Sequence, residues 1–296
     1  FLLCGSRLNR PTRLKCLEIQ STLSNEVSAE GSISEFLRSF HGLEQLAIST
    51  GSPAWTLDIW RAALHHKSTL KAFAYHQRGI VLDEDSPYFE EECDNPDLSL
   101  TLYDKEIAEW TSIPSQHPLS EPDLEILGLC CDPELLESVL SPLATKRSLR
   151  VIHIRQSATD LKFYASWAIQ HHFDAPDESS KSDTPTTYQS SQSEGSGEYV
   201  SLELTKPLHD LAQWAFGPNG LLSLEVIVYG DFSYEGRYAH SNVFLCRNAG
   251  LHQMQEQDMA CKTFRHFSRG DRRQRDLLNK YSSALAACPT GLLFQD

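Results

Sequence analysis

Long apolar runs are missing from this chain of 296 residues. No segment approaches the ~18 to 20 consecutive apolar residues that a membrane-spanning helix needs, and the apolar start at 1–4 is too short for the core of a signal peptide. Positive charge is also scarce, with 26 Lys and Arg against 40 Asp and Glu and a net charge of -14. Because phosphate groups are bound by concentrated Lys and Arg, this balance argues against a nucleic-acid or membrane surface and leaves basic partners open.

Metal-binding and catalytic motifs are lacking as well. The eight cysteines form no CxxC pair and no Cys/His spacing of a zinc site. The chain has no P-loop, HExxH, nucleophile elbow or glycine-rich dinucleotide fingerprint. We therefore expect no metal, no cofactor and no enzyme activity. Cys16, Cys130 and Cys131 lie on expected strands, where reduced thiols behave as small apolar side chains, so we expect a cytoplasmic or nuclear protein.

What the chain does contain is a recurring Leu-x-x-Leu-x-Leu pattern whose second residue is always charged. The copies are Leu14, Leu17, Ile19; Leu43, Leu46, Ile48; Leu70, Phe73, Tyr75; Leu124, Leu127, Leu129; Leu149, Ile152, Ile154; and Leu224, Ile227, Tyr229. They start at 14, 43, 70, 124, 149 and 224, so the intervals are 29, 27, 54, 25 and 75 residues. These intervals are close to one, one, two, one and three units of a repeat. Degenerate copies starting at Leu98 and Tyr199 would fill the two longest intervals.

Helical patterns follow most copies, as a strand-helix repeat requires. The capping box from Ser32 to Glu35 predicts a helix start, and Thr56, Asp132, Asp160 and Thr205 are N-cap candidates before further apolar helical stripes. Gly217 and Pro218 are expected to end the last of these helices.

The domain organisation follows from composition. We expect a repeat array over 1–239, interrupted by an acidic insertion at 83–97 and a disordered insertion at 173–198, and a C-terminal capping segment over 240–296. In this segment Val243 to Leu245 looks like a last strand, and Leu277, Leu278, Tyr281 and Leu285 suggest an end helix. The basic stretch at 269–275 is expected to face solvent or an acidic neighbour, with 83–97 as one candidate.

The copies resemble the βα leucine-rich repeats of ribonuclease-inhibitor-like and F-box proteins, and the whole arrangement is similar to fungal F-box or leucine-rich-repeat proteins. The resemblance implies an α/β fold, a leucine-rich-repeat solenoid (horseshoe) with a parallel concave sheet and convex helices. Positions 1, 4 and 6 of each copy would then face the helices, and positions 3, 5 and 7 would line the concave, partner-binding face. The expected partner-binding residues are Glu18, Gln20, Gln45, Ser49, His76, Ile126, Val151, His153, Arg155, Val226 and Val228.

This resemblance implies a non-catalytic scaffold that binds a protein partner. The chain starts at Phe1 without Met, so we expect a piece of a longer or processed protein. An F-box upstream would make the chain the substrate-recognition part of a ubiquitin-ligase receptor, joined to a ligase adaptor through its N-terminal region.

Alternatives remain open at this point. One is an α/β enzyme with Cys130 as nucleophile and His153 as base, oriented by Glu203. The other is a regulatory repeat protein that binds a basic partner through 83–97. The apolar concave residues from Ile126 onward form either a partner patch or the bed of the C-terminal segment, and we favour the second.

Overall fold

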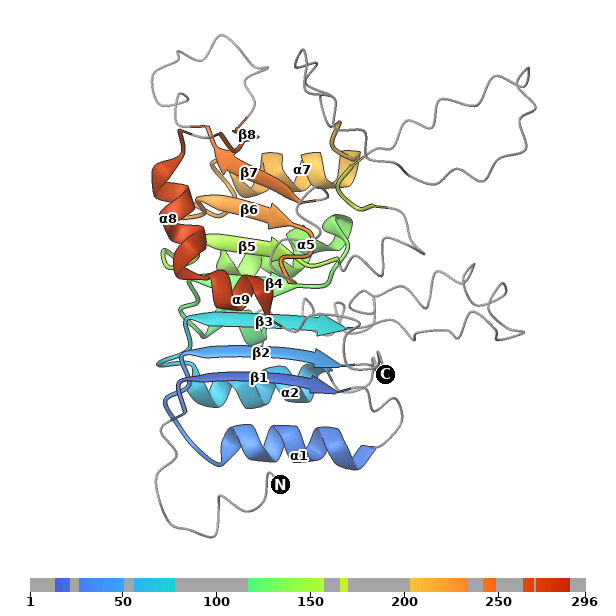
Figure 1. The fold of residues 1–296 in the computed structure, drawn as a ribbon, viewed down its shortest axis with the longest axis vertical. Coiled ribbons are helices and arrows are strands. Elements are labelled where there is room, and N and C mark those ends of the chain that lie inside the picture. Colours follow the sequence, from blue (N-terminus) through green and yellow to red (C-terminus); the bar gives the residue numbers. More distant parts are fainter. Residues whose placement is uncertain are drawn as a thin grey trace, which may run out of the picture.

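The computed structural model describes residues 14–21, 27–50, 56–77, 117–156, 166–169, 203–233, 242–248, 263–268 and 270–287. Within these residues the chain is an α/β protein. Eight strands form one open, uncurled, mixed sheet in chain order from β1 to β8, with helices on both faces (Figure 1). None of the helices in this part of the chain is both long and apolar enough to cross a membrane.

The first six strands are the six repeat copies. They are β1 (Cys16–Ser21), β2 (Gln45–Thr50), β3 (Ala72–Gln77), β4 (Ile126–Leu129), β5 (Val151–Ile154) and β6 (Val226–Tyr229). All five pairings are parallel and in phase, so the fourth residue of each copy lies beside the fourth residue of the next. Neighbours of this kind are Leu17 and Leu46, or Leu127 and Ile152. The predicted parallel sheet is confirmed.

Four α-helices pack on one face of this sheet, which we call the helix face. They are α1 (Val27–Arg38), α2 (Thr56–Ala63), α5 (Pro133–Leu140) and α7 (Lys206–Ala215); the short 3-10 helices η3 (Leu64–His66), η6 (Pro118–Ser120) and η7 (Ser141–Leu143) accompany them. Positions 1, 4 and 6 of the copies share one hydrophobic core with the apolar stripes of these helices. Trp60, for example, is buried on α2, and its ring centroid lies 4.7 Å from that of Phe73 in an edge-to-face arrangement. Positions 1, 4 and 6 therefore face the helices, as expected.

Two helix starts follow the predicted capping chemistry. The Asp132 carboxylate accepts a hydrogen bond from the Glu134 amide at 2.8 Å, and the Thr205 hydroxyl accepts one from Leu208 at 3.4 Å. Each side chain satisfies one of the amides that a helix start leaves without a partner. The capping box at Ser32 is a wrong helix start, because α1 already begins at Val27. Asp160 lies outside the described residues.

No strand lies between the neighbours that flank the two long intervals. β3 pairs directly with β4, and β5 pairs directly with β6, so the expected copies at Leu98 and Tyr199 are not inserted between them. Of the apolar residues of these copies only Leu204 is described, and it forms an isolated antiparallel bridge with Ile169. A strand between existing neighbours would break their in-phase backbone pairing. The insertions at 83–97 and 173–198 lie outside the described residues.

The C-terminal segment extends the sheet by two strands and then crosses one of its faces. β7 (Val243–Arg247) and β8 (Phe264–His266) add antiparallel strands beside β6. α8 (Arg272–Lys280) and α9 (Ser282–Ala286) then run back over the face opposite the helix face (Figure 1). The strand expected at Val243 to Leu245 is β7, but it is not the last one, because β8 follows it. The expected end helix is present as the two short helices α8 and α9.

Candidate partner-binding face

The face opposite the helix face carries the residues predicted to bind a partner. We call it the tail face, because α8 and α9, together the tail, cover its middle (Figure 1). It presents Gln45, Ala47, Ala72, Ala74, Ile126, Gly128, Val151, His153, Val226 and Val228. Since side chains alternate between the two faces of a strand, these residues follow directly from the register of the helix-face core.

The apolar part of the tail face forms a bed for the tail. Ala72, Ile126, Val151, Val226 and Val228 are each at most 3% exposed, and they share a hydrophobic cluster with Tyr281, Ala284 and Leu285 of the tail. Ala47 and Ala74 form a smaller cluster with Ala287. Four predicted partner-binding residues, Ile126, Val151, Val226 and Val228, thus lie in one buried cluster with the chain's own tail and are not accessible in this conformation.

Three other predicted residues come together in a buried polar cluster. Arg155, 6% exposed, donates from Nε to His76 Nδ1 at 3.3 Å and from Nη1 to His153 Nδ1 at 3.4 Å. His153 Nε2 donates to the Gly230 carbonyl at 2.9 Å. A carbonyl can only accept and a guanidinium can only donate, so these contacts hold His153 in its neutral Nε2–H form. Burial, and then the charge of Arg155, lower the pKa of His153 well below its usual value.

The reach of Arg155 depends on a glycine. Arg155 follows β5, whereas His76 belongs to β3, so the side chain has to cross β4. A Cβ at Gly128 on β4 would lie 3.3 Å from Arg155 Cδ and 3.3 Å from Ala74 Cβ. Gly128 therefore leaves the space through which Arg155 passes.

The guanidinium of Arg155 also holds the end of the tail. It donates to the carbonyls of Ala284 at 3.4 Å, Leu285 at 3.5 Å and Ala287 at 2.5 Å. The last carbonyls of a helix have no partner within the helix and carry partial negative charge, so a buried cation is a favourable cap there. A residue predicted to contact a partner thus binds the C-terminal end of α9.

The charged second positions of the copies form a row at the start of the strands, which we call the charge row. Its sign alternates strictly from β1 to β6: Lys15, Glu44, Lys71, Glu125, Arg150 and Glu225. Neighbours pair at 2.5 Å between Lys15 and Glu44 and at 2.6 Å between Arg150 and Glu225. Opposite charges on adjacent strands favour this register, because slipping one strand would move its charge away from the opposite charge on the neighbouring strand.

The tail binds two acids of the charge row. Arg273 contacts Glu225 at 2.8 Å and Lys280 contacts Glu125 at 2.7 Å, while the Tyr281 hydroxyl donates to Glu125. Burial raises the pKa of Glu125, but the hydrogen bonds from Lys280 and Tyr281 outweigh it and lower that pKa overall. Burial and the bond to Glu125 raise the pKa of Tyr281 to about 12. In the basic stretch at 269–275, Arg273 therefore has Glu225 as its acidic neighbour, whereas the other candidate, 83–97, lies outside the described residues.

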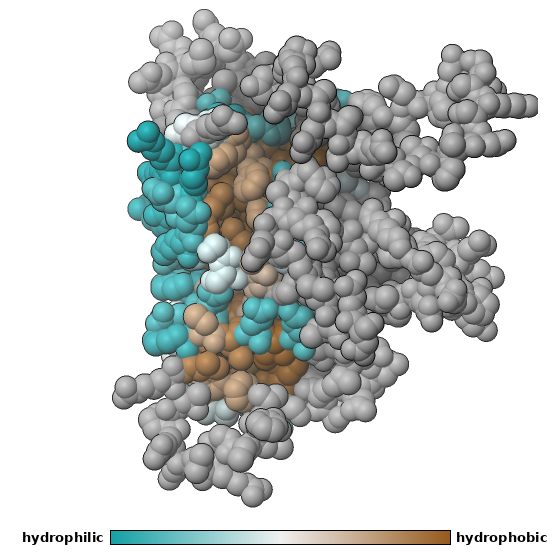
Figure 2. Space-filling model, viewed as in Figure 1, coloured by the Kyte–Doolittle hydropathy of each residue, from teal (hydrophilic) through white to brown (hydrophobic). Residues whose placement is uncertain are grey.

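The remaining predicted residues lie around β1 and β2. Glu18 is exposed and accepts from Gln20 at 3.2 Å, and Gln45 accepts from Ser283 of the tail at 3.1 Å. Ser49 is fully buried on β2. Figure 2 shows the hydrophilic outer surface of α8 along one side of the tail face. Among the predicted residues, Glu18, Gln20 and Gln45 retain solvent contact.

The residues of the possible thiol chemistry are buried or apart. Cys130 and His153 are each 1% exposed, and both ring nitrogens of His153 are hydrogen bonded. Glu203 is exposed and precedes α7, outside the sheet. Burial raises the pKa of the Cys131 thiol far above its usual range and that of Cys246 to about 12. A thiolate nucleophile needs the opposite shift.

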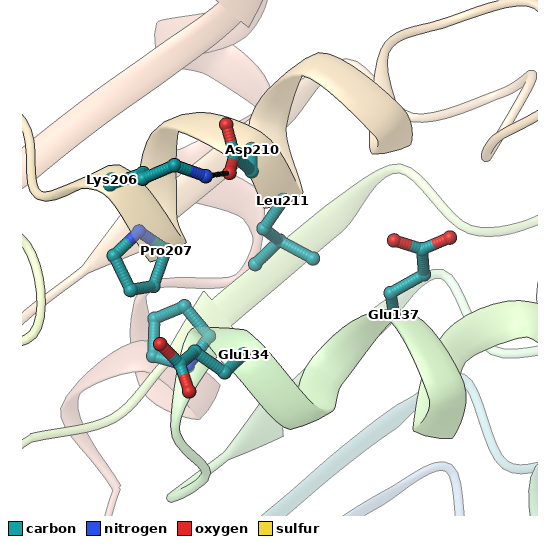
Figure 3. A pocket seen from close by; sticks show the side chains of 7 residues that line it. Glu134, Glu137, Lys206, Pro207, Asp210 and Leu211 are labelled. Atoms are coloured by element: carbon teal, nitrogen blue, oxygen red, sulfur yellow. Dashed lines mark hydrogen bonds and ion pairs between the residues drawn. The ribbon is translucent and has the colours of Figure 1, made fainter.

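A hollow of about 330 Å³ lies between the starts of α5 and α7 (Figure 3). Pro133, Pro207 and Leu211 line it with Glu134 and Glu137, and Lys206 pairs with Asp210 at its rim. It belongs to the helix side of the molecule and contains no histidine or cysteine. Among the described residues no group of three or more His, Cys, Asp or Glu side chains is arranged to hold a metal ion.

Two features of this face were not predicted. The alternating sign of the charge row was visible in the sequence, because the second residue of every copy is charged. The role of Gly128 was not visible, since it depends on a side chain from another strand.

Comparison of the chain with family models, curated proteins and solved structures gives no match, so function has to be inferred from the residues themselves.

Proposed function

We propose that this chain is a non-catalytic scaffold of βα leucine-rich repeats that binds a protein partner through its tail face. One observation carries the proposal. Six copies of one sequence pattern pair in chain order and in phase, so equivalent positions of every copy lie on the same face. Stacked repeats of this kind form extended surfaces suited to protein recognition. The curved, horseshoe shape of leucine-rich-repeat arrays is part of this proposal.

The chemistry of the buried groups favours binding over catalysis. His153 is neutral with both nitrogens engaged, and the thiol of Cys130, the possible nucleophile, is buried at 1% exposure. A general base needs a free nitrogen within reach of a substrate, and a thiol nucleophile needs a lowered pKa in an accessible place.

The resemblance to F-box leucine-rich-repeat proteins extends the proposal. In this extension the array recognises a substrate protein, and a region upstream of Phe1 binds a ubiquitin-ligase adaptor. Recovery of such an adaptor with the full-length protein is the expected result, and its absence would remove the extension while leaving the scaffold intact.

Site-specific cross-linking tests the scaffold itself. A photoreactive residue is placed at Glu18 or Gln45 on the tail face and, as a matched control, at Glu137 on the exposed surface of α5. In cells expressing the full-length protein we expect a discrete cross-linked partner from the two tail-face positions and none from Glu137. Equal cross-linking from all three positions, or none from any, would contradict the assignment of the tail face.

A further inference from the structure

The tail has the composition of a short ligand helix. α8 carries Arg272, Arg273, Arg275 and Lys280, and its side chains are exposed or half-buried. Its inner side presents Leu277 and Leu278. α8 ends at Lys280, and the backbone leaves the helical conformation at Tyr281. Tyr281, which precedes the following helix α9, and Leu285 of α9 join the same apolar cluster.

The tail face is complementary to that helix in both charge and shape. Its acids Glu225 and Glu125 meet Arg273 and Lys280 at the two ends of α8. The larger side chains Val151, Val226 and Val228 lie in the same cluster as α8, whereas alanines on β2 and β3 lie where α9 approaches. The carbonyls that end α9 meet Arg155. The tail face thus contacts the basic residues, the apolar residues and the C-terminal carbonyls of the tail with different groups.

The order of the tail depends on this face. α8 has nine residues and α9 has five. Helices this short are marginal in water without tertiary contacts, so release of the tail and loss of its helical structure are one event. Its ion pairs lie at the surface, since the side chains of Arg273 and Lys280 are 73% and 59% exposed. Such pairs contribute little stability but select a partner's charge pattern.

We propose that the tail face between β3 and β6 is a receptor for a basic amphipathic helix of a protein partner, and that α8 and α9 occupy it in cis until that helix displaces them. The inference rests on the proposed function and names the class of partner. The partner helix presents apolar residues in place of Leu278 and Tyr281, and basic residues in place of Arg273 and Lys280 at the two ends of α8. Helix-in-groove recognition reads such anchors one turn apart, and a cis occupant lowers the affinity measured for the partner.

A peptide of residues 270–287 tests the receptor in trans. The labelled peptide is titrated into the full chain and into the variant Tyr281→Ala/Leu285→Ala, which weakens the tail and leaves the bed unchanged. We expect the variant to bind at least about tenfold more tightly than the wild type, and the peptide to gain helical circular dichroism on binding. Equal affinity for the two chains, or binding to neither, overturns the proposal.

Charge variants define where the peptide binds. In the same tail-weakened chain, Glu125→Lys/Glu225→Lys should reduce affinity at least about tenfold, and the matched pair Glu134→Lys/Glu137→Lys on α5 should leave it unchanged. Equal losses from both pairs overturn the proposal, because they would show binding by net charge alone.

Hydrogen exchange of the wild-type chain supplies a test that needs no variant. Amides of α8 and α9 should exchange at least about tenfold faster than those of β5, because the tail opens without global unfolding. Equal rates overturn the proposal, since the tail would then be a permanent part of the fold. Cross-linking from Glu18 and Gln45 could still succeed in that case, so the two proposals fail separately.

Discussion

At the scale of single residues, the buried cluster of Arg155, His153 and His76 shows how a polar group is kept inside this fold. Arg155 finds acceptors on two histidines and on the end of α9, and Gly128 leaves room for its side chain. The sequence pattern placed all three polar residues on one face. It did not indicate that they would contact each other, because the bond from Arg155 to His76 crosses an intervening strand.

The buried histidines make stability depend on pH. The folded chain holds the pKa of His153 well below 6.5 and lowers that of His117 to about 4, mainly by burial. Below pH 6.5 the unfolded chain therefore binds more protons than the folded chain, and stability falls as the pH is lowered. We expect each of these two histidines to cost about 2 kcal/mol of unfolding free energy between pH 7 and pH 5.

Urea denaturation at pH 7 and pH 5 measures this dependence. The variant His153→Gln can still donate to Gly230 and accept from Arg155, but it does not titrate. Its loss of stability between the two pH values should be smaller than that of the wild type by about 2 kcal/mol. An unchanged difference would mean that the pKa of His153 is the same in the folded and unfolded chains.

At the scale of elements, local chemistry accounts for most boundaries. Asp132 and Thr205 were predicted as caps and are caps, because each accepts a hydrogen bond from a backbone amide two or three residues further along the chain. The start of α1 at Val27 was missed, since the capping pattern at Ser32 lies inside that helix. β8 was missed as well, because three residues are too few to show a strand period.

The N-cap of α7 offers a test at this scale. The Thr205 hydroxyl accepts from the Leu208 amide and donates to the Trp167 carbonyl at 2.5 Å, so it joins the helix start to the preceding segment. Thr205→Ala should reduce the unfolding free energy in urea by about 1 to 2 kcal/mol. The matched change Thr145→Ala, at an exposed turn, should stay within about 0.5 kcal/mol of the wild type, and equal losses would contradict the cap.

At the scale of the whole molecule, the sheet has unequal ends. β7 and β8 cover the end beside β6, and the tail covers the middle of the tail face. At the other end Leu17 and Ile19 of β1 are only partly buried, and Figure 2 shows hydrophobic surface there. A strand inside the array has neighbours on both sides, whereas β1 has a neighbour on one side only. Side chains are therefore buried most deeply in the middle of the array.

Equivalent leucines at the two places should therefore differ in their contribution to stability. Leu17 and Leu127 occupy the same position of their copies, but Leu17 is partly buried and Leu127 is 0% exposed. Leu127→Ala should cost about 2 to 5 kcal/mol of unfolding free energy and Leu17→Ala about 1 kcal/mol. Chemical denaturation of the two variants measures the difference, and equal losses would show that the β1 end is buried as deeply as the middle.

The sequence by itself determined the six repeat strands, their parallel register and the residues on each face. These features follow from the spacing of apolar residues along single segments. Because all six copies have the same pattern, only the in-phase arrangement places the apolar residues of every strand on the same face. Only the tertiary structure decided which strands are neighbours across the long intervals, and that α8 and α9 occupy the tail face. These outcomes depend on contacts between residues far apart in the chain, such as Arg155 with Ala287 and Glu125 with Lys280, which no local period encodes.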